Sequence, residues 1–265
     1  MSYSKLNIRV IKALFNSQYA NMLEYRVEIA LWALSGVLPF IMLSIWKESG
    51  AAISYGFDGI SLSRYFLSAF LVRQFSVVWV VFSFEEDALL GKLSPYLIQP
   101  LHPLWRYFAS HIAEQVTRLP FALLITFTFF FFNPDSFWIP SLMVFLLAWL
   151  STIFAFLIAF LLQSIIASLC FWNEKASSLE RLLFTTYLFL SGLLAPISSF
   201  PPNIQKIVLL TPFPYMISFP ANILSGLAEN IFIGFIIQIT WISILLPVVI
   251  LLWKAGVRKY TAMGA

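Results

Sequence analysis

Three charged side chains interrupt apolar stretches of this sequence, and their chemistry needs an explanation first. Arg73 lies within the apolar stretch 65–84, while Glu114 and Arg118 lie near the start of the stretch 107–133. Glu114 precedes Arg118 by four residues, which is the favourable order for an ion pair on one helix. Arg73 has no such local partner, so it must face protein or water and could pair with Glu114 or Glu180. This intramembrane polar network is either a gate along a substrate path or a packing bridge that fixes the order of the helices, and we favour the bridge.

A second candidate group lies in residues 84–106, between two apolar stretches. Glu85, Glu86 and Asp87 would open a short helix, where acidic side chains complement the helix dipole. Leucines supply an apolar side before Pro95 ends this helix, at positions 89, 90 and 93. The segment is too polar to cross a membrane and too apolar for a simple linker. A short amphipathic helix of this kind suits a surface that receives force from a soluble motor, and the alternative is a connector at the membrane interface.

Residue types for catalysis or metal binding are scarce. His102 and His111 are the two histidines, and neither lies deep enough in an apolar stretch to form a Ser/His pair with Ser191. The single cysteine, Cys170, has no Cys or His partners at metal-binding spacing. We therefore expect neither an enzyme nor a resident cofactor or metal.

Gly91 and Lys92 form the one pair that resembles part of a phosphate-binding loop. A Walker loop needs Gly five residues before this pair and Ser or Thr after it, but Glu86 precedes the pair and Leu93 follows it. The chain cannot bind ATP in this way. If ATP drives its activity, the nucleotide must be bound by a partner subunit.

The composition indicates where these residues must sit. Of 265 residues, 60% are hydrophobic and 11% are charged, and the mean hydropathy is +0.88. Soluble domains have about 45–50% apolar and about 25% charged residues, so this chain lacks the polar residues that cover a soluble surface. The net charge of +4 gives no support to nucleic-acid binding. We therefore predict an all-α membrane protein that forms one domain over residues 1–265.

Six apolar stretches are long enough, at about 20 residues, to cross a membrane as helices. These transmembrane spans are expected at 29–46, at 65–84, at 107–133, within 136–173, at 182–199 and at 230–253. Before them, residues 1–25 carry Lys5, Arg9, Lys12 and Asn16 on one stripe of a helix. This pattern predicts an amphipathic helix at the anionic inner surface of the membrane. The alternative is a more specific function for this helix, as a docking platform for a cytoplasmic partner.

Residues 200–228 are also apolar but are unsuited to a straight crossing. Pro212, Pro214 and Pro220 fall close together, and each removes a backbone donor and clashes with the preceding turn. We expect this outer segment to enter the outer leaflet and return. Cytoplasmic loops carry an excess of Lys and Arg, and six spans satisfy that rule with both termini in the cytoplasm. The prediction from these features is a membrane protein with several crossings.

The order of these features resembles an ABC-2 type transporter permease. The shared features are an amphipathic N-terminal helix, six spans, an acidic-Gly-Leu-Pro loop after the second span and a proline-rich outer segment before the sixth. The loop pattern of that family is matched by Glu86 or Asp87, Gly91, Leu93, Leu97, Pro100 and Leu101. The outer pattern is matched by Ser191, Gly192, Pro196, Pro201, Pro212, Pro214 and Tyr215, with Thr211 in place of the usual Asn. Within the family, the chain is similar to small bacterial exporter permeases of the paired type.

The resemblance implies a permease subunit of an ABC exporter. Cytoplasmic ABC ATPase subunits would bind the ATP, and a second permease subunit would complete a homodimer or heterodimer. The residues implied in coupling to the ATPase are Glu85, Glu86, Gly91, Leu93 and Pro100, and those implied in an outer gate are Gly192, Pro196, Pro212 and Tyr215. A hydrophobic or amphipathic substrate would move outward by alternating access, along a path lined by spans two and five.

Two other classes of function stay open from the sequence. An ion-gradient-driven carrier or channel would use Arg73, Glu114 and Gln238 as a polar pathway. An intramembrane enzyme is the third class, and the scarcity of catalytic residues argues against it.

The predicted topology is testable by cysteine labelling in intact cells. With both termini in the cytoplasm, Tyr3→Cys and Ala262→Cys should be protected from a membrane-impermeant thiol reagent. Lys206→Cys and Glu229→Cys should both react from outside, because the outer segment would begin and end on the same side. Labelling at either terminus would overturn this orientation, and reaction of Glu229→Cys only from the cytoplasm would make residues 207–228 a true span.

Overall fold

The computed structural model describes residues 8–50, 55–173 and 175–260, and every regular element in this part is a helix. The longer helices are α1 (Ile8–Glu24), α2 (Arg26–Ser35), α3 (Leu38–Glu48), α5 (Gly59–Ser76), α6 (Val80–Leu89), α8 (Pro103–Phe132), α9 (Leu142–Ser168), α10 (Ser177–Leu190) and α13 (Ile231–Val257). The shorter helices are α7 (Leu93–Ile98), α11 (Pro202–Leu209) and α12 (Ser218–Ser225), and single 3₁₀ turns join some of them. The expected all-α architecture is confirmed for this part of the chain.

Five segments of the described part are long and apolar enough to cross a membrane. They are Val27–Glu48, Gly59–Leu89, Pro103–Phe132, Leu142–Phe171 and Ile231–Val257, and each matches one of the expected spans. The expected span 182–199 is not one helix, because α10 ends at Leu190 and irregular backbone follows. The 14 residues of α10 rise about 21 Å, which is less than the roughly 30 Å of a hydrocarbon core.

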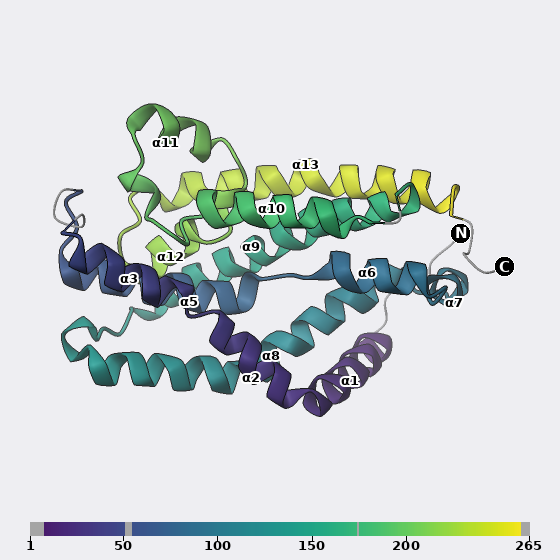
Figure 1. The fold of residues 1–265 in the computed structure, drawn as a ribbon, viewed down its shortest axis with the longest axis horizontal. Coiled ribbons are helices and arrows are strands. Elements are labelled where there is room, and N and C mark those ends of the chain that lie inside the picture. Colours follow the sequence, from purple (N-terminus) through teal and green to yellow (C-terminus); the bar gives the residue numbers. More distant parts are fainter. Residues whose placement is uncertain (1–7, 51–54, 174, 261–265) are drawn as a thin grey trace.

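The expected span 65–84 is a broken helix. Helix α5 ends at Ser76, and α6 begins at Val80 in nearly the same direction (Figure 1). Between them Val77 has an extended backbone, with φ −70° and ψ 138°. The expected span is therefore found as one apolar segment, Gly59–Leu89, but its helix is interrupted, and the break lies deep inside the structure because Val77 and Val78 are buried.

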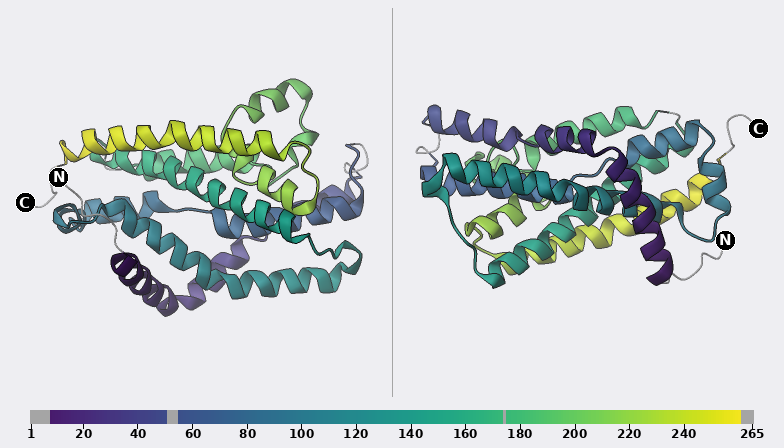
Figure 2. Two further views of the ribbon diagram at one scale, coloured as in Figure 1. Left: turned by 180° about the vertical axis from the view of Figure 1, so that it is seen from behind. Right: turned by 90° about the horizontal axis from the view of Figure 1, so that it is seen from below.

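Helices α5 and α9 occupy the centre of the structure (Figures 1 and 2). Helix α5 contacts α3, α8, α9 and α12, and α9 also contacts α13. Most side chains of α5 are buried, and Tyr65, Phe66 and Phe70 are completely covered. Helix α7 and the C-terminal end of α13 lie at one end of the long axis, and α11 lies toward the other (Figure 1).

Helix α1 has the amphipathic character that the sequence predicts. Leu14, Phe15 and Tyr19 are half-buried on the side where α1 contacts α8, whereas Lys12 and Asn16 are exposed. Residues 1–7, including Lys5, lie outside the described residues. The position of α1 at a membrane surface stays a prediction.

The outer segment folds as two short helices, and its return within the outer leaflet stays a prediction. Helix α11 is separated from α12 by a 3₁₀ turn at Phe213–Tyr215, which follows Pro212. Helix α12 packs against α5 and α9 and buries Ser218, Pro220, Ala221 and Ile223. The segment is therefore not a straight helix, and its inner half is part of the protein core.

Gly192 joins α10 to this outer segment in a conformation that few other residues adopt. Its φ is +91°, and a Cβ at this position would lie 2.5 Å from Tyr65 Oη and 2.7 Å from Ser218 Cβ. The Tyr65 hydroxyl donates a hydrogen bond to the Gly192 carbonyl (2.7 Å), and Ser218 N–H donates one to the Ser191 carbonyl (2.9 Å). Close backbone approach and positive φ both require glycine here.

Replacing Gly192 by alanine should therefore destabilise the protein strongly. A non-glycine residue at positive φ costs about 1–3 kcal/mol, and the contacts with Tyr65 and Ser218 should add about 1–3 kcal/mol of overpacking. Gly226→Ala is the matched control, because Gly226 has φ +80° but open space around it. Thermal unfolding in detergent should show a larger fall in Tm for Gly192→Ala, and equal losses for the two variants would show that the close packing is unimportant.

Candidate functional site

The break between α5 and α6 is held by polar side chains of two neighbouring helices. The Gln115 amide of α8 donates a hydrogen bond to the Phe75 carbonyl (2.7 Å). His111 Nε2, also on α8, accepts one from Trp79 N–H (2.8 Å), and Gln163 Oε1 of α9 accepts one from Val81 N–H (3.3 Å). Backbone groups in a lipid-facing protein must find partners inside the protein, so these three side chains make the break possible.

The hydrogen bonds also fix the orientation of two of these side chains. His111 Nε2 accepts from Trp79, so Nδ1 carries the proton and donates to the Tyr107 carbonyl at 2.8 Å. Gln163 Oε1 is occupied by Val81, so its amide nitrogen points the other way and donates to Glu180 Oε1 of α10 at 3.1 Å. The break in one helix is thereby linked to a buried carboxylate on another.

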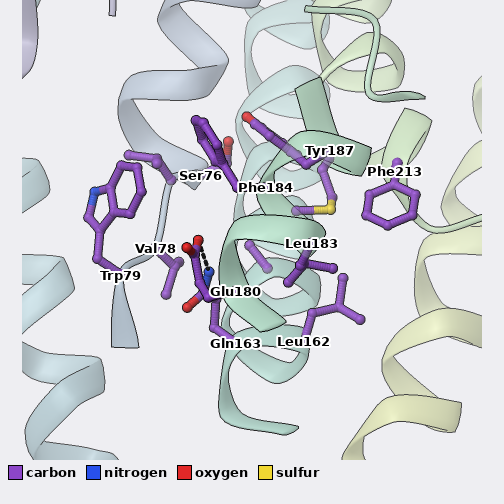
Figure 3. A pocket seen from close by; sticks show the side chains of 13 residues that line it. Ser76, Val78, Trp79, Leu162, Gln163, Glu180, Leu183, Phe184, Tyr187 and Phe213 are labelled. Atoms are coloured by element: carbon purple, nitrogen blue, oxygen red, sulfur yellow. Dashed lines mark hydrogen bonds between the residues drawn. The ribbon is translucent and has the colours of Figure 1, made fainter. Parts of the chain in front are cut away.

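A small cavity lies at this point, between the break, α9 and α10 (Figure 3). Its volume is about 40 Å³, which is room for about three water molecules. We call it the break cavity, and the residues that give it chemical character are Ser76, Trp79, Gln163, Glu180, Phe184 and Tyr187. Glu180, Phe184 and Tyr187 follow one face of α10, because they are four and three residues apart.

Arg73 does not form the ion pair expected for it. Within the described part it lies within 4 Å of neither Glu114 nor Glu180. Instead, a Cβ on Gly36 would lie 3.0 Å from Arg73 Nη1, so the guanidinium lies against the junction of α2 and α3. Arg73 also interacts electrostatically with Arg118 and with Tyr187. It therefore connects the first spanning segment to the polar interior without a carboxylate partner.

Glu114 and Arg118 form the expected ion pair on α8. Glu114 Oε1 and Arg118 Nη2 are 3.2 Å apart, and both side chains are almost completely buried. Their position next to His111 and Gln115 places the pair on the helix face that supports the break. This geometry suits a packing bridge, and a role in a gate stays a prediction.

The acidic residues of segment 84–106, the loop for which coupling to an ATPase is expected, lie elsewhere on their helix than predicted. Helix α6 runs from Val80 to Leu89, so Glu85, Glu86 and Asp87 lie near its C-terminal end and not at its start. Glu85 accepts hydrogen bonds from Ser177 N–H (2.7 Å) and Oγ (3.0 Å), and thereby caps the start of α10. Asp87 accepts one from Tyr107 of α8 (2.8 Å).

The remaining coupling residues divide into buried and exposed ones. Leu93 is completely buried, so it cannot touch a partner in this conformation, and Pro95 lies inside α7 rather than ending a helix. Gly91 has φ +71° and makes the turn between α6 and α7. The exposed side chains are Glu86, Leu89, Leu90, Ile98 and Pro100, and Glu86 lies 3.7 Å from Lys92.

His102 ends this loop as the cap of α8. Its Nδ1 accepts a hydrogen bond from Leu104 N–H (3.2 Å). Burial against Trp253 lowers the pKa of His102 to about 4. The imidazole is therefore neutral near pH 7 and keeps its acceptor for the cap.

The residues implied in the outer gate form part of a fixed structure. Pro196 and Pro212 are buried and precede 3₁₀ turns. The Tyr215 carbonyl accepts a hydrogen bond from Gln238 of α13 (2.9 Å), and its hydroxyl donates to the Leu209 carbonyl (3.1 Å). A role of these residues in opening and closing a path stays a prediction.

Sequence reasoning missed the residues that hold the break. Gln115 and Gln163 are neutral amides inside apolar stretches, and the signal that could have found them is the cost of burying an unpaired amide. Tyr65 was missed as well, because an aromatic residue in an apolar helix reads as packing bulk.

Comparison with known proteins gives one family. The family model described as ABC-2 family transporter protein matches residues 43–264, which covers α5 through α13. No curated protein and no solved structure matches the chain. Membrane subunits of this family are typically not catalytic themselves and typically pair with ATPase subunits. The resemblance found in the sequence is thus confirmed, and the chain belongs to the ABC-2 family of transporter proteins as a multi-pass permease subunit.

Proposed function

We propose that this permease subunit exports a hydrophobic or amphipathic substrate by alternating access, powered by ATP that a separate ATPase binds. The observation that carries the proposal is the break cavity, where a polar interior meets α10 at a broken helix. Discontinuous helices at membrane depth line substrate sites in transporters because their backbone needs polar surroundings. The direction of transport follows the resemblance to exporter permeases.

In this proposal the chain crosses the bacterial inner membrane six times, with cytoplasmic termini. The irregular residues that follow α10 complete its crossing, since the 14-residue helix is too short alone. Helices α11 and α12 enter the outer leaflet and return, and α12 is shielded from lipid by α5 and α9. Irregular backbone at membrane depth is tolerated under such shielding.

The ATPase would dock on the exposed surface of α6 and α7, which we call the coupling surface. It consists of Glu86, Leu89, Leu90, Ile98 and Pro100, and Ile98 is 80% exposed. An apolar patch with an acidic neighbour is typical of a protein contact. Glu85 and Leu93 would support the coupling surface indirectly. Glu85 holds the start of α10, and the buried Leu93 stabilises the fold of the loop.

A second permease subunit would cover α10. This helix exposes Leu182 (67%) and Phe189 (59%) beside the exposed Arg181 and Thr185. Lipid accommodates the apolar residues, but it offers no partner to Arg181 near the inner end of the helix. A partner subunit would pack against Leu182 and Phe189 and would offer polar groups to Arg181, in a homodimer or a heterodimer.

An ion-gradient-driven carrier or channel gains no support. The polar groups that it would use are engaged in separate contacts. Glu114 is paired with Arg118, and Gln238 is hydrogen-bonded to the Ser151 and Tyr215 carbonyls. They form no shared pathway with Arg73 in the described part.

Charged substitutions on the coupling surface should uncouple the complex from its ATPase. We expect Leu90→Asp and Ile98→Asp to leave the protein inserted and folded, because both side chains are exposed, and to abolish substrate-stimulated ATP hydrolysis. Leu210→Asp is the matched control, since Leu210 is 77% exposed on the outer segment. Hydrolysis should be measured with the permease and ATPase co-expressed and purified together. Normal stimulation in both coupling variants would contradict the docking role. A variant of the buried Leu93, such as Leu93→Asp, would not test docking, because it would place a charge in the core and unfold the loop.

A further inference from the structure

Glu180 is a buried carboxylate that forms no ion pair in the described part. Its side chain is 2% exposed, and the one cation that acts on it, Arg181, is an exposed neighbour in sequence that lies beyond ion-pair distance. Gln163 donates a hydrogen bond to Oε1. The start of α10 offers a favourable dipole, but Glu85 places a second negative charge there. A buried charge needs a partner to offset its loss of hydration, so the site is incomplete as it stands.

Two hydroxyl groups in the break cavity also lack partners. Ser76 Oγ is buried and makes no hydrogen bond within residues 8–50, 55–173 and 175–260, and Tyr187 Oη, which faces the Arg73 side chain, makes none of ordinary distance and angle there. Both line the same cavity as Glu180. Arg73 interacts electrostatically with Tyr187 but lies beyond ion-pair distance of Glu180. Together, the carboxylate and the hydroxyls offer oxygen acceptors to a ligand that donates hydrogen bonds.

Aromatic rings form the rest of the wall. The Trp79 and Phe184 rings are 5.8 Å apart, and the Phe184 and Tyr187 rings are 6.1 Å apart. Figure 3 shows them on the side of Ser76, above Glu180 and Gln163. Ring faces attract cations and give no hydrogen bonds of their own. One carboxylate beside aromatic rings is too poor in oxygen ligands for Mg²⁺ or Ca²⁺, and it matches an organic ammonium group.

We propose that the break cavity binds the ammonium group of an amphipathic amine, with Glu180 as its counter-charge. The inference rests on the proposed transport function and names its substrate class. The cavity of about 40 Å³ has room for the charged head, so most of the apolar part of the amine would extend beyond it. Ser76 Oγ offers a further acceptor in the same cavity.

The position of Glu180 connects this site to the coupling surface. Glu180 lies in the first turn of α10, and Glu85 at the end of α6 holds that turn through Ser177. Gln163 joins Glu180 to the first turn of α6 through Val81. An amine on Glu180 therefore acts on the two contacts that fix α10 to the helix leading into the coupling surface.

Binding to the purified full chain in lipid nanodiscs tests the proposal without any ATPase. The probes are 2-phenylethylammonium and its neutral analogue 2-phenylethanol, measured by calorimetry. We expect the amine to bind and the alcohol to bind roughly tenfold or more weakly, because a hydrogen bond to a charged group is worth that factor. Equal binding of the two probes, or no binding of the amine, would overturn the proposal.

Variants locate the binding. Glu180→Gln keeps an acceptor for Gln163 and should weaken amine binding roughly tenfold or more, and Phe184→Leu should weaken it by a smaller factor. Lys206→Gln is the control, because it removes an exposed positive charge on α11, away from the residues that line the cavity. Thermal unfolding shows that each variant is folded, and unchanged binding by folded Glu180→Gln would rule out the site. ATP hydrolysis by the complex of permease and ATPase is measured separately. If another substrate stimulates hydrolysis while the amine does not bind, the export function is supported and the amine site is ruled out.

Discussion

The constraint on which this structure depends is that every backbone polar group at membrane depth must find a partner in the protein. A continuous helix meets this requirement by itself, but α5 and α6 are separated by a break that frees carbonyl and N–H groups among buried valines. Gln115, His111 and Gln163 supply the missing partners from α8 and α9. Lipid cannot do so, and the positions of α8 and α9 around α5 are therefore tied to the break.

The same three side chains explain why other polar groups cluster nearby. Gln163 has two ends, so satisfying Val81 obliges its amide to face Glu180. Glu114 and Arg118 flank Gln115 on α8 and are paired with each other. The break thus gathers polar residues that would be costly if scattered, because an unpaired polar group in an apolar interior costs about 2–7 kcal/mol. A transporter needs such a polar interior, and the fold produces it with few charges.

The sequence predicted those parts of the fold that depend on local pattern. Span length, the amphipathic α1 and the proline-broken outer segment follow from hydropathy and backbone chemistry, and so does the pairing of Glu114 with Arg118. The break at Val77 could not be predicted, because β-branched residues are compatible with a helix and the stabilising groups lie 32 to 82 residues further along the chain. The role of Glu85 was unpredictable for the same reason, since its partner Ser177 is 92 residues away. Tertiary contacts decided these features.

These long-range contacts identify α10 as the element best placed to move. Its main contacts are with α6, α9 and the turn at Phe213–Tyr215, and one side of it is exposed. Two acidic residues secure its first turn, Glu85 from outside the helix and Glu180 from within it. Both contacts are hydrogen bonds to a carboxylate, which depend on local charge, whereas α13 and α12 are held by apolar packing and by hydrogen bonds between neutral groups. A change of charge or position at the end of α6 therefore acts directly on α10 through Glu85, as it acts on α8 through Asp87, and the first of these contacts is the one that the proposed coupling would use if a path opens beside α10.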